Sequence, residues 1–593
     1  MTSYMAHSPS EENPQWQTLR DHVEGVTRLT EHHVRYLGVP HLSVYARLTG
    51  LLHDLGKYRD DFQMYRLNWH PHQEREDKTL GERPVPHSDA GAKLIQACLD
   101  ADREAGNELP FVIANHHGRL RDVDALESRL DSTDLNEVGA LLDRAKRDTP
   151  ELADLLNSEL PDLTLEGTER AFLIRFLLGA LVDADRLDTE GHGSPSRARL
   201  RDAHRADQEE MGLLLARLEA EQYRKATQDA TDPQPINALR REMYASALEY
   251  ASLEPGFFRL TMPTGGGKTL TSLAFALAHA RQHGLRRVIY AVPFTNIIDQ
   301  TARTFRAVLE QAGEFKVLEH HSNLEVPERK EGQERQTSAP DLATENWDAP
   351  VIVTTTVRLF QETLYGTRTA QLRRLHNVSG SVIVLDEAQS LPAHLLRPTL
   401  DALQFLVQYA GCSVVLCTAT QPALDERLGF PALANIRDLV PEAGHYFDAL
   451  RRVDYEFRTA EPTAWADLAD ELTTHDQVLC IVNTRQHAHD LYALLGEDDA
   501  NFHLSTSMCP AHRKRELETI RKRLKAGLPC RVVSTQLIEA GVDVDFPRVY
   551  RAMGPLEAIV QAAGRCNREG RLELGHVVVF VPENHKLPPG DYE

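Results

Sequence analysis

The most constraining feature of this 593-residue chain is a change of pattern after its first third. Beyond residue 236, short apolar runs rich in β-branched residues alternate with helical stretches, whereas residues 1–205 read as mostly helical and contain no such run. This alternation predicts parallel sheets whose strands are joined by crossover helices. The expected strands are 257–262, 288–292, 351–355, 382–385, 414–417, 478–482, 531–534 and 577–581.

The chain is too long for a single hydrophobic core, so we expect several domains. A charged helical pattern at 201–226 and a proline-containing segment at 231–235 predict a linker, and an apolar-poor break at 440–461 predicts the division between two α/β halves. We expect the polar residues 322–348 to form a surface insertion. The predicted units are a helical domain, a helical linker and two α/β domains, at 1–205, 206–235, 236–445 and 446–593.

Composition excludes some classes of protein. The net charge of -22 has the wrong sign for coating duplex DNA by bulk attraction, but a strand can still be held in a local channel. The apolar stretch 172–182 is too short to span a bilayer, and no leader pattern follows Met1. The cysteines form no C-x-x-C pair, and Cys412 and Cys417 are expected in the core. We therefore expect a cytoplasmic protein with no membrane partner.

A glycine-rich turn lies between the first expected strand and a helix. Backbone amides of such a turn can bind phosphate oxygens, and the helix N-terminus adds positive potential. Lys268 would neutralise the β- and γ-phosphates of ATP, and Thr269 would bind Mg²⁺. The strict pattern has glycine where this chain has Met262, so the turn alone is also compatible with a structural role. The expected phosphate contacts are Thr264, Gly265, Gly266, Gly267, Lys268 and Thr269.

Two further segments favour the nucleotide site. The expected strand 382–385 delivers Asp386 and Glu387 to the carboxyl edge of the sheet. There Asp386 would hold Mg²⁺, and Glu387 would orient or deprotonate the attacking water. In the second half, Arg565 and Arg568 have helical i, i+3 spacing and could reach the γ-phosphate from the opposite domain. The alternative, a solvated basic face, is disfavoured because three motifs occur in the right order.

From 236 to 582 these motifs together resemble superfamily 2 helicases. The resemblance implies that Asp543 and Gln561 also contact the nucleotide, and that residues 418–420 couple hydrolysis to domain motion. It leaves open whether Asn237, Arg240 and Arg241 recognise adenine or form an ordinary helix face. The residues expected to contact a nucleic-acid strand are Pro293, Phe294, Thr295, Thr355, Thr356 and Thr535, with Thr354, Ser505, Thr506 and Ser534 in the same segments.

The helical part carries a second constellation, of histidines and aspartates. His53 and Asp54 lie in an apolar helical context, and a buried imidazole–carboxylate pair needs a partner, which a metal can supply. An isolated pair of this kind is more often a hydrogen-bonded core dyad, but five further candidates surround it. The candidate ligands are His22, His53, Asp54, His87, His116, His117 and Asp185. Surface or packing roles are expected for His32, His33, His41, His70 and His72, and His7 is left open.

Mixed imidazole and carboxylate ligands suit manganese, iron, nickel, cobalt or zinc better than magnesium. Two such metals could activate water and stabilise the leaving oxygen of a phosphodiester.

The same residues resemble the HD phosphohydrolase superfamily. The version with His87 and the pair His116-His117 is similar to the nuclease domain of the CRISPR-associated helicase-nucleases of type I systems, which precedes a superfamily 2 helicase. Segments 53–57 (HDLGK), 345–348 (ENWD) and 386–389 (DEAQ) support the resemblance. It implies an all-α HD domain followed by two RecA-like domains, ATP-driven 3′-to-5′ movement, and cleavage of single-stranded DNA. It also implies recruitment to a guide-RNA surveillance complex in antiviral defence.

By the family pattern, one metal would be bound by His22, His53, Asp54 and Asp185. Asp54 would bridge to a second metal bound by His87, His116 and His117, and Lys57 is expected to be catalytic. Asp183 remains an alternative to Asp185 as the last ligand.

Family members usually continue into a C-terminal accessory domain, whereas only residues 569–593 follow Arg568 here. Docking to the complex and processive unwinding are therefore open. Two other interpretations remain: an HD phosphatase or cyclic-nucleotide hydrolase that regulates an RNA helicase, and a motor that binds DNA or partners without unwinding. The ENWD segment and the additional histidines favour the nuclease-helicase.

Overall fold

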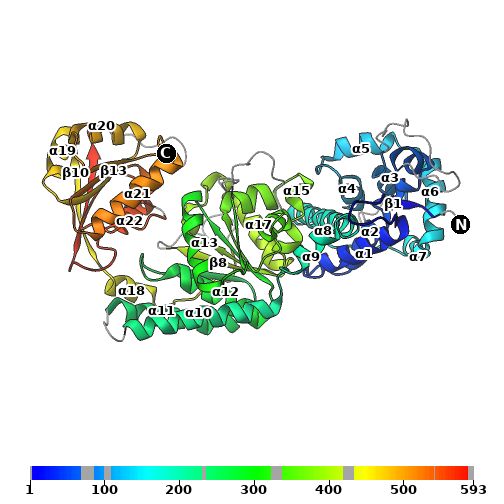
Figure 1. Ribbon diagram of the computed structural model, residues 1–593, viewed down its shortest axis with the longest axis horizontal. Coiled ribbons are helices and arrows are strands. Elements are labelled where there is room, and N and C mark those ends of the chain that lie inside the picture. The colour runs from blue at the N-terminus through cyan, green and yellow to red at the C-terminus, as the bar shows by residue number, and fades with distance from the viewer. Residues whose placement is uncertain are drawn as a thin grey trace.

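The computed structural model describes residues 3–67, 86–98, 108–229, 235–321, 337–418, 433–539 and 541–584. Three parts lie in a row: a helical N-terminal part, a seven-stranded sheet and a six-stranded sheet (Figure 1). This order confirms the predicted fold class. His70, His72, Ala419, Thr420 and residues 322–336 lie outside the described residues.

The helical part is built around one long helix, α8 (Gly167–Gly193), which packs against α1 (Leu19–Val34), α2 (Leu42–Leu52) and α4 (Glu108–Ala114). The remaining elements are the short helices η1 (Leu55–Tyr58) and η2 (Phe62–Arg66), then α3 (Asp89–Cys98), α5 (Val123–Asp131), α6 (Leu135–Asp148), α7 (Glu151–Asn157) and α9 (Pro195–Asp202). A small antiparallel pair that the sequence did not predict, β1 (Met5–His7) and β2 (Gln17–Thr18), precedes α1.

The middle sheet is parallel, with the order β5-β6-β4-β7-β8-β3-β9. Its strands are β3 (Phe257–Thr261), β4 (Arg287–Val292), β5 (Val317–His320), β6 (Val351–Thr355), β7 (Ser381–Leu385), β8 (Ser413–Thr418) and β9 (Arg437–Asp438). Its connections include α12 (Lys268–His283), α13 (Thr295–Leu309), α14 (Ala339–Asn346), η4 (Arg358–Leu364), α15 (Thr369–Leu372), α16 (Leu375–Val378) and α17 (Leu396–Gln408), while α10 (Gln208–Asp229) and α11 (Pro235–Glu249) precede it.

The second sheet is also parallel, with the order β10-β15-β14-β11-β13-β12. Its strands are β10 (Val453–Thr463), β11 (Gln477–Ile481), β12 (Asn501–Leu504), β13 (Cys530–Ser534), β14 (Arg548–Ala552) and β15 (Gly575–Pro582). The helices are α18 (Ala443–Ala449), α19 (Trp465–Thr473), α20 (Arg485–Leu495), α21 (Pro510–Lys525) and α22 (Leu556–Ala563). All eight predicted strands are present in the two sheets.

Two segments that the sequence marked as irregular are ordered in the structure. The expected break at 440–461 lies between β9 of the middle sheet and the second sheet, but it contains α18 and most of β10, a largely exposed edge strand in which apolar and charged residues alternate instead of forming a continuous apolar run. Residues 339–348 are not a surface insertion, because α14 ends at the fully buried Trp347, and Asp348 pairs with the buried Arg287 at 2.9 Å.

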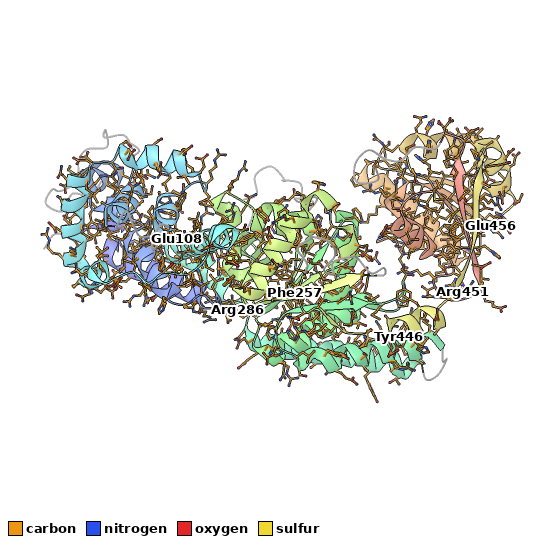
Figure 2. All side chains as sticks on the ribbon, turned by 180° about the vertical axis from the view of Figure 1, so that it is seen from behind. Glu108, Phe257, Arg286, Tyr446, Arg451 and Glu456 are labelled. Carbon is orange, nitrogen blue, oxygen red and sulfur yellow. The ribbon has the colours of Figure 1, made fainter. Side chains whose placement is uncertain are left out.

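The helical part and the middle sheet share one hydrophobic core. Buried apolar side chains of α1, α2 and α8 continue without interruption into one face of the sheet, at Ile289, Ile383 and Val414. The opposite face of the sheet packs against α12 and α13. Arg286, labelled in Figure 2 where the helical part meets the sheet, lies over the Tyr36 ring at 4.2 Å. Opening this junction would expose a large apolar area at about 25 cal/mol per Å², so the two parts form one unit.

Among the residues placed in the structure, no helix has both the length and the apolar character needed to cross a bilayer.

Candidate metal and nucleotide sites

A close approach of two backbone segments assembles the histidine–aspartate cluster. His53 and Asp54 follow the buried helix α2, and Gly56 lies directly against the backbone of His87. The Gly56 N–H donates to the His87 carbonyl at 3.1 Å, and a Cβ on Gly56 would collide with that carbonyl. Glycine is thus required here, and the crossing brings His87 Nε2 to 3.6 Å from Asp54 Oδ1.

The first candidate group joins α1, α2 and α8. His22 Nε2 lies 3.1 Å from Asp54 Oδ2 and 3.4 Å from Asp185 Oδ1, and His53 Nε2 lies 3.2 Å from Asp54 Oδ2. All four residues are buried, and their potential ligand atoms lie within 4.8 Å of one another. The structure therefore brings together the four residues that the family pattern assigns to one metal.

The second group uses the other oxygen of Asp54. Its Oδ1 lies 3.7 Å from His116 Nε2, while His87 Nε2 faces His117 Nε2 at 2.6 Å. The potential ligand atoms of this group also lie within 4.8 Å of one another. Asp54 therefore presents one carboxylate oxygen to each group, as a bridging ligand would.

Hydrogen bonds fix which nitrogen of three histidines carries the lone pair. Nδ1 of His53 donates to the Gly50 carbonyl at 2.7 Å, and Nδ1 of His116 donates to the Ile113 carbonyl at 2.6 Å. A neutral imidazole bonded in this way has its lone pair on Nε2. Nδ1 of His22 similarly contacts Asp188 Oδ2 at 2.7 Å, an arrangement typical of metal-binding histidines.

The cluster also contains buried atoms that lack a hydrogen-bond partner among the described residues: His53 Nε2, His116 Nε2 and Asp54 Oδ1. A buried polar atom left unpaired costs about 1–3 kcal/mol, so three that converge on one place require an explanation. Two divalent cations would satisfy all three atoms, and the imidazole–carboxylate donor set suits transition metals. The residues present therefore fit the implied metals.

The charges in the cluster support this conclusion. Burial opposes ionisation of Asp54, but His53 and Lys57 hold its pKa well below the usual range. Lys57 Nζ lies 2.6 Å from Asp54 Oδ2. Burial and Lys57 oppose protonation of His22, yet hydrogen bonds to Asp185, Asp188 and Asp54 raise its pKa to about 10. The negative charge of these carboxylates stabilises a nearby cation. Bound metals would supply that positive charge in place of the proton on His22.

A cavity of about 500 Å³ opens onto this cluster and is lined by His7, Lys57, His116, His117, Asp185 and Arg186, among others. His7, which the sequence left open, contacts the His22 ring edge to face at 4.8 Å, and burial lowers its pKa to about 2. Arg186 is exposed, forms no ion pair among the described residues, and donates to Thr369 Oγ1 at 3.4 Å. Sequence reasoning missed both Arg186 and Asp188, although Asp188 has helical i, i+3 spacing from Asp185.

The structure separates Asp185 from Asp183. Asp183 accepts from Arg373 Nε and contacts His376 Nε2, both at 2.7 Å, and it accepts from Asn346 Nδ2 at 3.1 Å. Asp183 thus belongs to the junction with the middle sheet, and Asp185 is the carboxylate of the cluster. His33 stacks on His376 at 3.8 Å, in the packing role that the sequence predicted. Because Arg373 already neutralises Asp183, this third group of histidines and aspartate is an ionic junction.

The glycine-rich turn follows β3 and leads into α12. A cavity of about 380 Å³ beside it is lined from both sheets. Its walls include Thr264, Gly265, Gly267, Lys268, Thr269, Asp386, Glu387, Asp543, Gln561, Arg565 and Arg568. Gly266 instead lines an adjoining cavity between the turn, α10 and α11, together with Asn237, Arg240 and Arg241. Arg240 donates to the Gly265 carbonyl at 2.9 and 2.7 Å, so it is anchored on the turn.

Carboxylates hold Lys268 in the nucleotide cavity. Its Nζ lies 2.6 Å from Glu387 Oε1 and 3.3 Å from Asp386 Oδ1. Despite burial, these charges raise the pKa of Lys268 above its ordinary value. Burial raises the pKa of Asp386, whereas Lys268 and Gln389 hold the pKa of Glu387 below its usual range in spite of burial.

The helical spacing predicted for Arg565 and Arg568 was wrong. Helix α22 ends at Ala563, and Asn567 then adopts a left-handed conformation with φ 46°. The turn is fixed because the Asn567 side chain donates to the carbonyls of Arg452 and Leu572.

Both arginines nevertheless line the nucleotide cavity. Arg565 donates to the carbonyls of Ile538 and Glu539 at 3.0 and 2.6 Å, and Arg568 Nε lies 3.1 Å from Asp543 Oδ1. Sequence reasoning missed Arg452, which donates to the Thr264 carbonyl at 2.6 Å and to the carbonyl of Arg568. Arg452 therefore connects the glycine turn to the second sheet.

The expected strand-contacting residues follow the carboxyl ends of strands. Strand β4 is followed by Pro293, Phe294 and Thr295. The neighbouring strand β6 ends at Thr355 and is followed by Thr356. Phe294 is 47% exposed, which leaves its ring free to meet a base. Thr535 follows β13 in the second sheet, and Ser505 and Thr506 follow the neighbouring strand β12.

Comparison with known proteins identifies three regions. Residues 12–187 match the family model "Cas3, HD domain", residues 242–427 match "DEAD/DEAH box helicase", and residues 474–571 match "CRISPR-associated nuclease/helicase Cas3, C-terminal".

Curated relatives carry the name CRISPR-associated nuclease/helicase Cas3. The Haloferax volcanii protein is 26% identical over 446 residues, which are 57% of this chain and 48% of the relative. The Methanothermobacter thermautotrophicus protein is 22% identical over 346 residues, which are 55% of this chain and 40% of the relative. The matched region thus spans about half the length of these relatives or less.

Solved structures share the fold. The crystal structure of T. fusca Cas3 with ADP has a TM-score of 0.64 and 19% identity, and the match covers 99% of this chain and 76% of that one. A chain in a structure called "CRISPR RNA-guided surveillance complex, pre-nicking" has a TM-score of 0.58 and 17% identity, over 99% of this chain and 75% of that one. With an HD domain and a C-terminal region of the Cas3 type on either side of a helicase domain, the chain belongs to the CRISPR-associated nuclease/helicase family.

Proposed function

We propose that this protein is an ATP-driven motor that moves single-stranded DNA, in the 3′-to-5′ direction, to a two-metal nuclease during type I CRISPR interference. The observation that carries the proposal is the pair of ligand groups that share Asp54, with unpaired nitrogens directed into both. A phosphatase acting on a small substrate could use one such site. The motor in the same chain favours a strand as substrate over a free nucleotide.

In the nuclease site, His22, His53, Asp54 and Asp185 would hold one metal, and Asp54, His87, His116 and His117 would hold the other. Bound manganese, iron, nickel or cobalt would activate a water and stabilise the leaving oxygen of the phosphodiester. Asp188 orients the His22 ring, and Lys57 stabilises the negative charge of Asp54. Arg186 is placed at the cavity to neutralise a phosphate of the strand.

In the nucleotide site, Lys268 and the amides of the turn would bind the β- and γ-phosphates of ATP. Thr269 and Asp386 would hold Mg²⁺, and Glu387 would orient the attacking water. Arg565 and Arg568 would leave their present oxygen partners and reach the γ-phosphate as the two sheets close. Asp543 and Gln561 line the same cavity and would sense this closure.

The strand would cross the carboxyl edges of both sheets, where it meets Phe294, Thr295, Thr355, Thr356 and Thr535, beside Pro293. Hydroxyls and backbone amides at this edge suit a phosphate backbone without an overall basic surface. We further propose a cytoplasmic location, the domain divisions near 205, 235 and 445, and recruitment by a guide-RNA surveillance complex. The fold shared with a chain in such a complex supports the last point.

Paired variants test the proposal on circular single-stranded DNA. Manganese or cobalt should permit cleavage, and chelation should abolish it. Asp54→Ala should remove cleavage but keep strand-stimulated ATP hydrolysis, whereas Lys268→Ala should remove hydrolysis but keep metal-dependent nicking. His32→Ala, a histidine outside both ligand groups, is the matched control and should retain both activities. Normal cleavage by Asp54→Ala would show that the assigned site is wrong.

A further inference from the structure

The connection between β6 and β7 of the middle sheet passes directly beside the nuclease site. Its residues 367–376, here called the clasp, contact two elements that carry metal-ligand candidates, one for each of the two ligand groups. These elements are the turn after His116-His117 and the helix α8. The clasp belongs to the motor part of the chain, yet it contacts elements that carry nuclease residues.

The first contact is with the turn that follows His117. The N–H and the hydroxyl of Thr369 both donate to the Gly118 carbonyl, at 3.2 and 3.0 Å. The Leu120 N–H donates to the Thr367 carbonyl at 2.7 Å, and Arg119 pairs with Arg368 in an antiparallel bridge. Gly118 directly follows His117 in the chain, so this short pairing restrains the positions of His116 and His117.

The second contact is with α8. Arg373 and His376 of the clasp bind the two oxygens of Asp183, each at 2.7 Å, and all three side chains are buried. Two residues along a helix correspond to a rotation of roughly 200°, so Asp183 and Asp185 point to opposite sides of α8. One carboxylate therefore anchors the helix on the clasp while the other contributes to the metal cluster. Gly179, one turn earlier, lies so close to the Leu372 carbonyl that a Cβ there would collide with it.

The ends of this connection carry functional residues of the motor. Thr355 and Thr356, proposed to contact the strand, precede it, and Asp386 and Glu387, proposed to act on ATP, follow β7. The Arg358 N–H donates to Thr355 Oγ1 at 3.1 Å, which ties the start of the connection to the strand-contacting edge.

We propose that the clasp is a positioning element of the nuclease site, and that Thr369 is its key positioning residue. The clasp holds His116 and His117 at the distance from Asp185 that two metals sharing Asp54 require. This inference rests on the proposed metal-dependent nuclease. It adds that the motor part of the chain sets the metal affinity of the HD part, through residues that touch neither metal nor DNA.

Thr369→Val tests the proposal in the full chain, because it removes one hydroxyl and keeps the side-chain shape. Without nucleotide, the variant should bind Mn²⁺ about fivefold more weakly in calorimetric titration, because one neutral hydrogen bond contributes about 1 kcal/mol. The Mn²⁺ concentration for half-maximal cleavage should rise by the same factor. Because Thr369 Oγ1 also accepts from Arg186, cleavage is compared at saturating Mn²⁺ and saturating DNA, where it should stay within twofold of wild type, as should strand-stimulated ATP hydrolysis.

Thr363→Val is the matched control. Thr363 lies in η4 of the same connection, is fully buried, and its hydroxyl has no hydrogen-bond partner among the described residues. This variant should bind Mn²⁺ as wild type does, and Thr369→Ser should restore most of the affinity that Thr369→Val loses.

Two outcomes would overturn the inference: wild-type Mn²⁺ affinity in Thr369→Val, or an equal loss of affinity in Thr363→Val. Unchanged Mn²⁺ binding in Asp54→Ala would instead overturn the proposed nuclease site, so the two failures can be told apart.

Discussion

Asp188→Asn is the variant whose effect follows most directly from the geometry. Asp188 Oδ2 receives the His22 Nδ1 hydrogen at 2.7 Å and a hydrogen bond from Gln17 Nε2 at 2.7 Å. An asparagine can place its carbonyl oxygen in the same position, so both bonds remain and only the negative charge disappears. The substitution therefore isolates the electrostatic support that Asp188 gives to a metal-binding imidazole.

The expected magnitude comes from the difference between charged and neutral hydrogen bonds. A bond to a charged group contributes about 1.5–3 kcal/mol and a neutral one about 0.5–1.5 kcal/mol. Losing the charge should thus cost about 1–1.5 kcal/mol, which corresponds to roughly tenfold weaker metal binding. The basicity of His22 should fall as well, because Asp188 is one of the carboxylates that raise its pKa.

Calorimetric titration with Mn²⁺, and cleavage of single-stranded DNA as a function of Mn²⁺, measure this effect. The Mn²⁺ concentration at the midpoint of both curves should rise about tenfold for Asp188→Asn. Asp61→Asn, at an exposed aspartate of the same helical part, should change neither midpoint. Unchanged Mn²⁺ affinity in Asp188→Asn would refute the assignment of His22 as a metal ligand supported by Asp188.

Three further predictions concern Arg186, Arg452 and His279. Arg186→Gln should raise the KM for single-stranded DNA several-fold with little change in kcat, and it should reduce the slope of log affinity against log salt by about 0.7. Arg452→Ala removes a bond to the Thr264 carbonyl and should slow strand-stimulated ATP hydrolysis while metal-dependent nicking persists. Burial lowers the pKa of His279 to about 4, so the folded state excludes a proton that the unfolded chain binds below pH 6.5. Stability should therefore fall as the pH drops from 6.5 to 4, by up to about 1.4 kcal/mol per pH unit for this group, and His279→Gln should show a shallower fall in chemical unfolding.

Much of the fold could be predicted from the sequence, because buried parallel strands such as Val351–Thr355 read as uninterrupted β-branched runs. Strand β10 was missed because an exposed edge strand has no such pattern. Trp347 and Asp348 were assigned to a surface insertion because their segment is polar, whereas Trp347 is fully buried and donates to His320, and Asp348 pairs with the buried Arg287. Local composition does not show that a polar segment will be covered by another domain.

The candidate sites, like the fold, could be predicted only in part. Residue types indicated the candidate ligands, and the family resemblance divided them into two groups around Asp54. Neither could separate Asp183 from Asp185, since both follow the same apolar stretch of the sequence. The choice depends on which side of α8 faces Arg373, a tertiary contact between residues far apart in sequence. Arg565 and Arg568 were placed on a helix by their spacing, yet α22 ends at Ala563, before both, and Asn567 between them has a left-handed backbone.

The most direct test of the account is the number of Mn²⁺ ions that the full chain binds without nucleotide, compared between the wild type and Asp54→Ala. We predict two ions in the HD part of the wild type. In the variant, both high-affinity sites and cleavage should be lost, while strand-stimulated ATP hydrolysis continues. Two ions still bound with wild-type affinity in Asp54→Ala, or cleavage that persists without them, would contradict it.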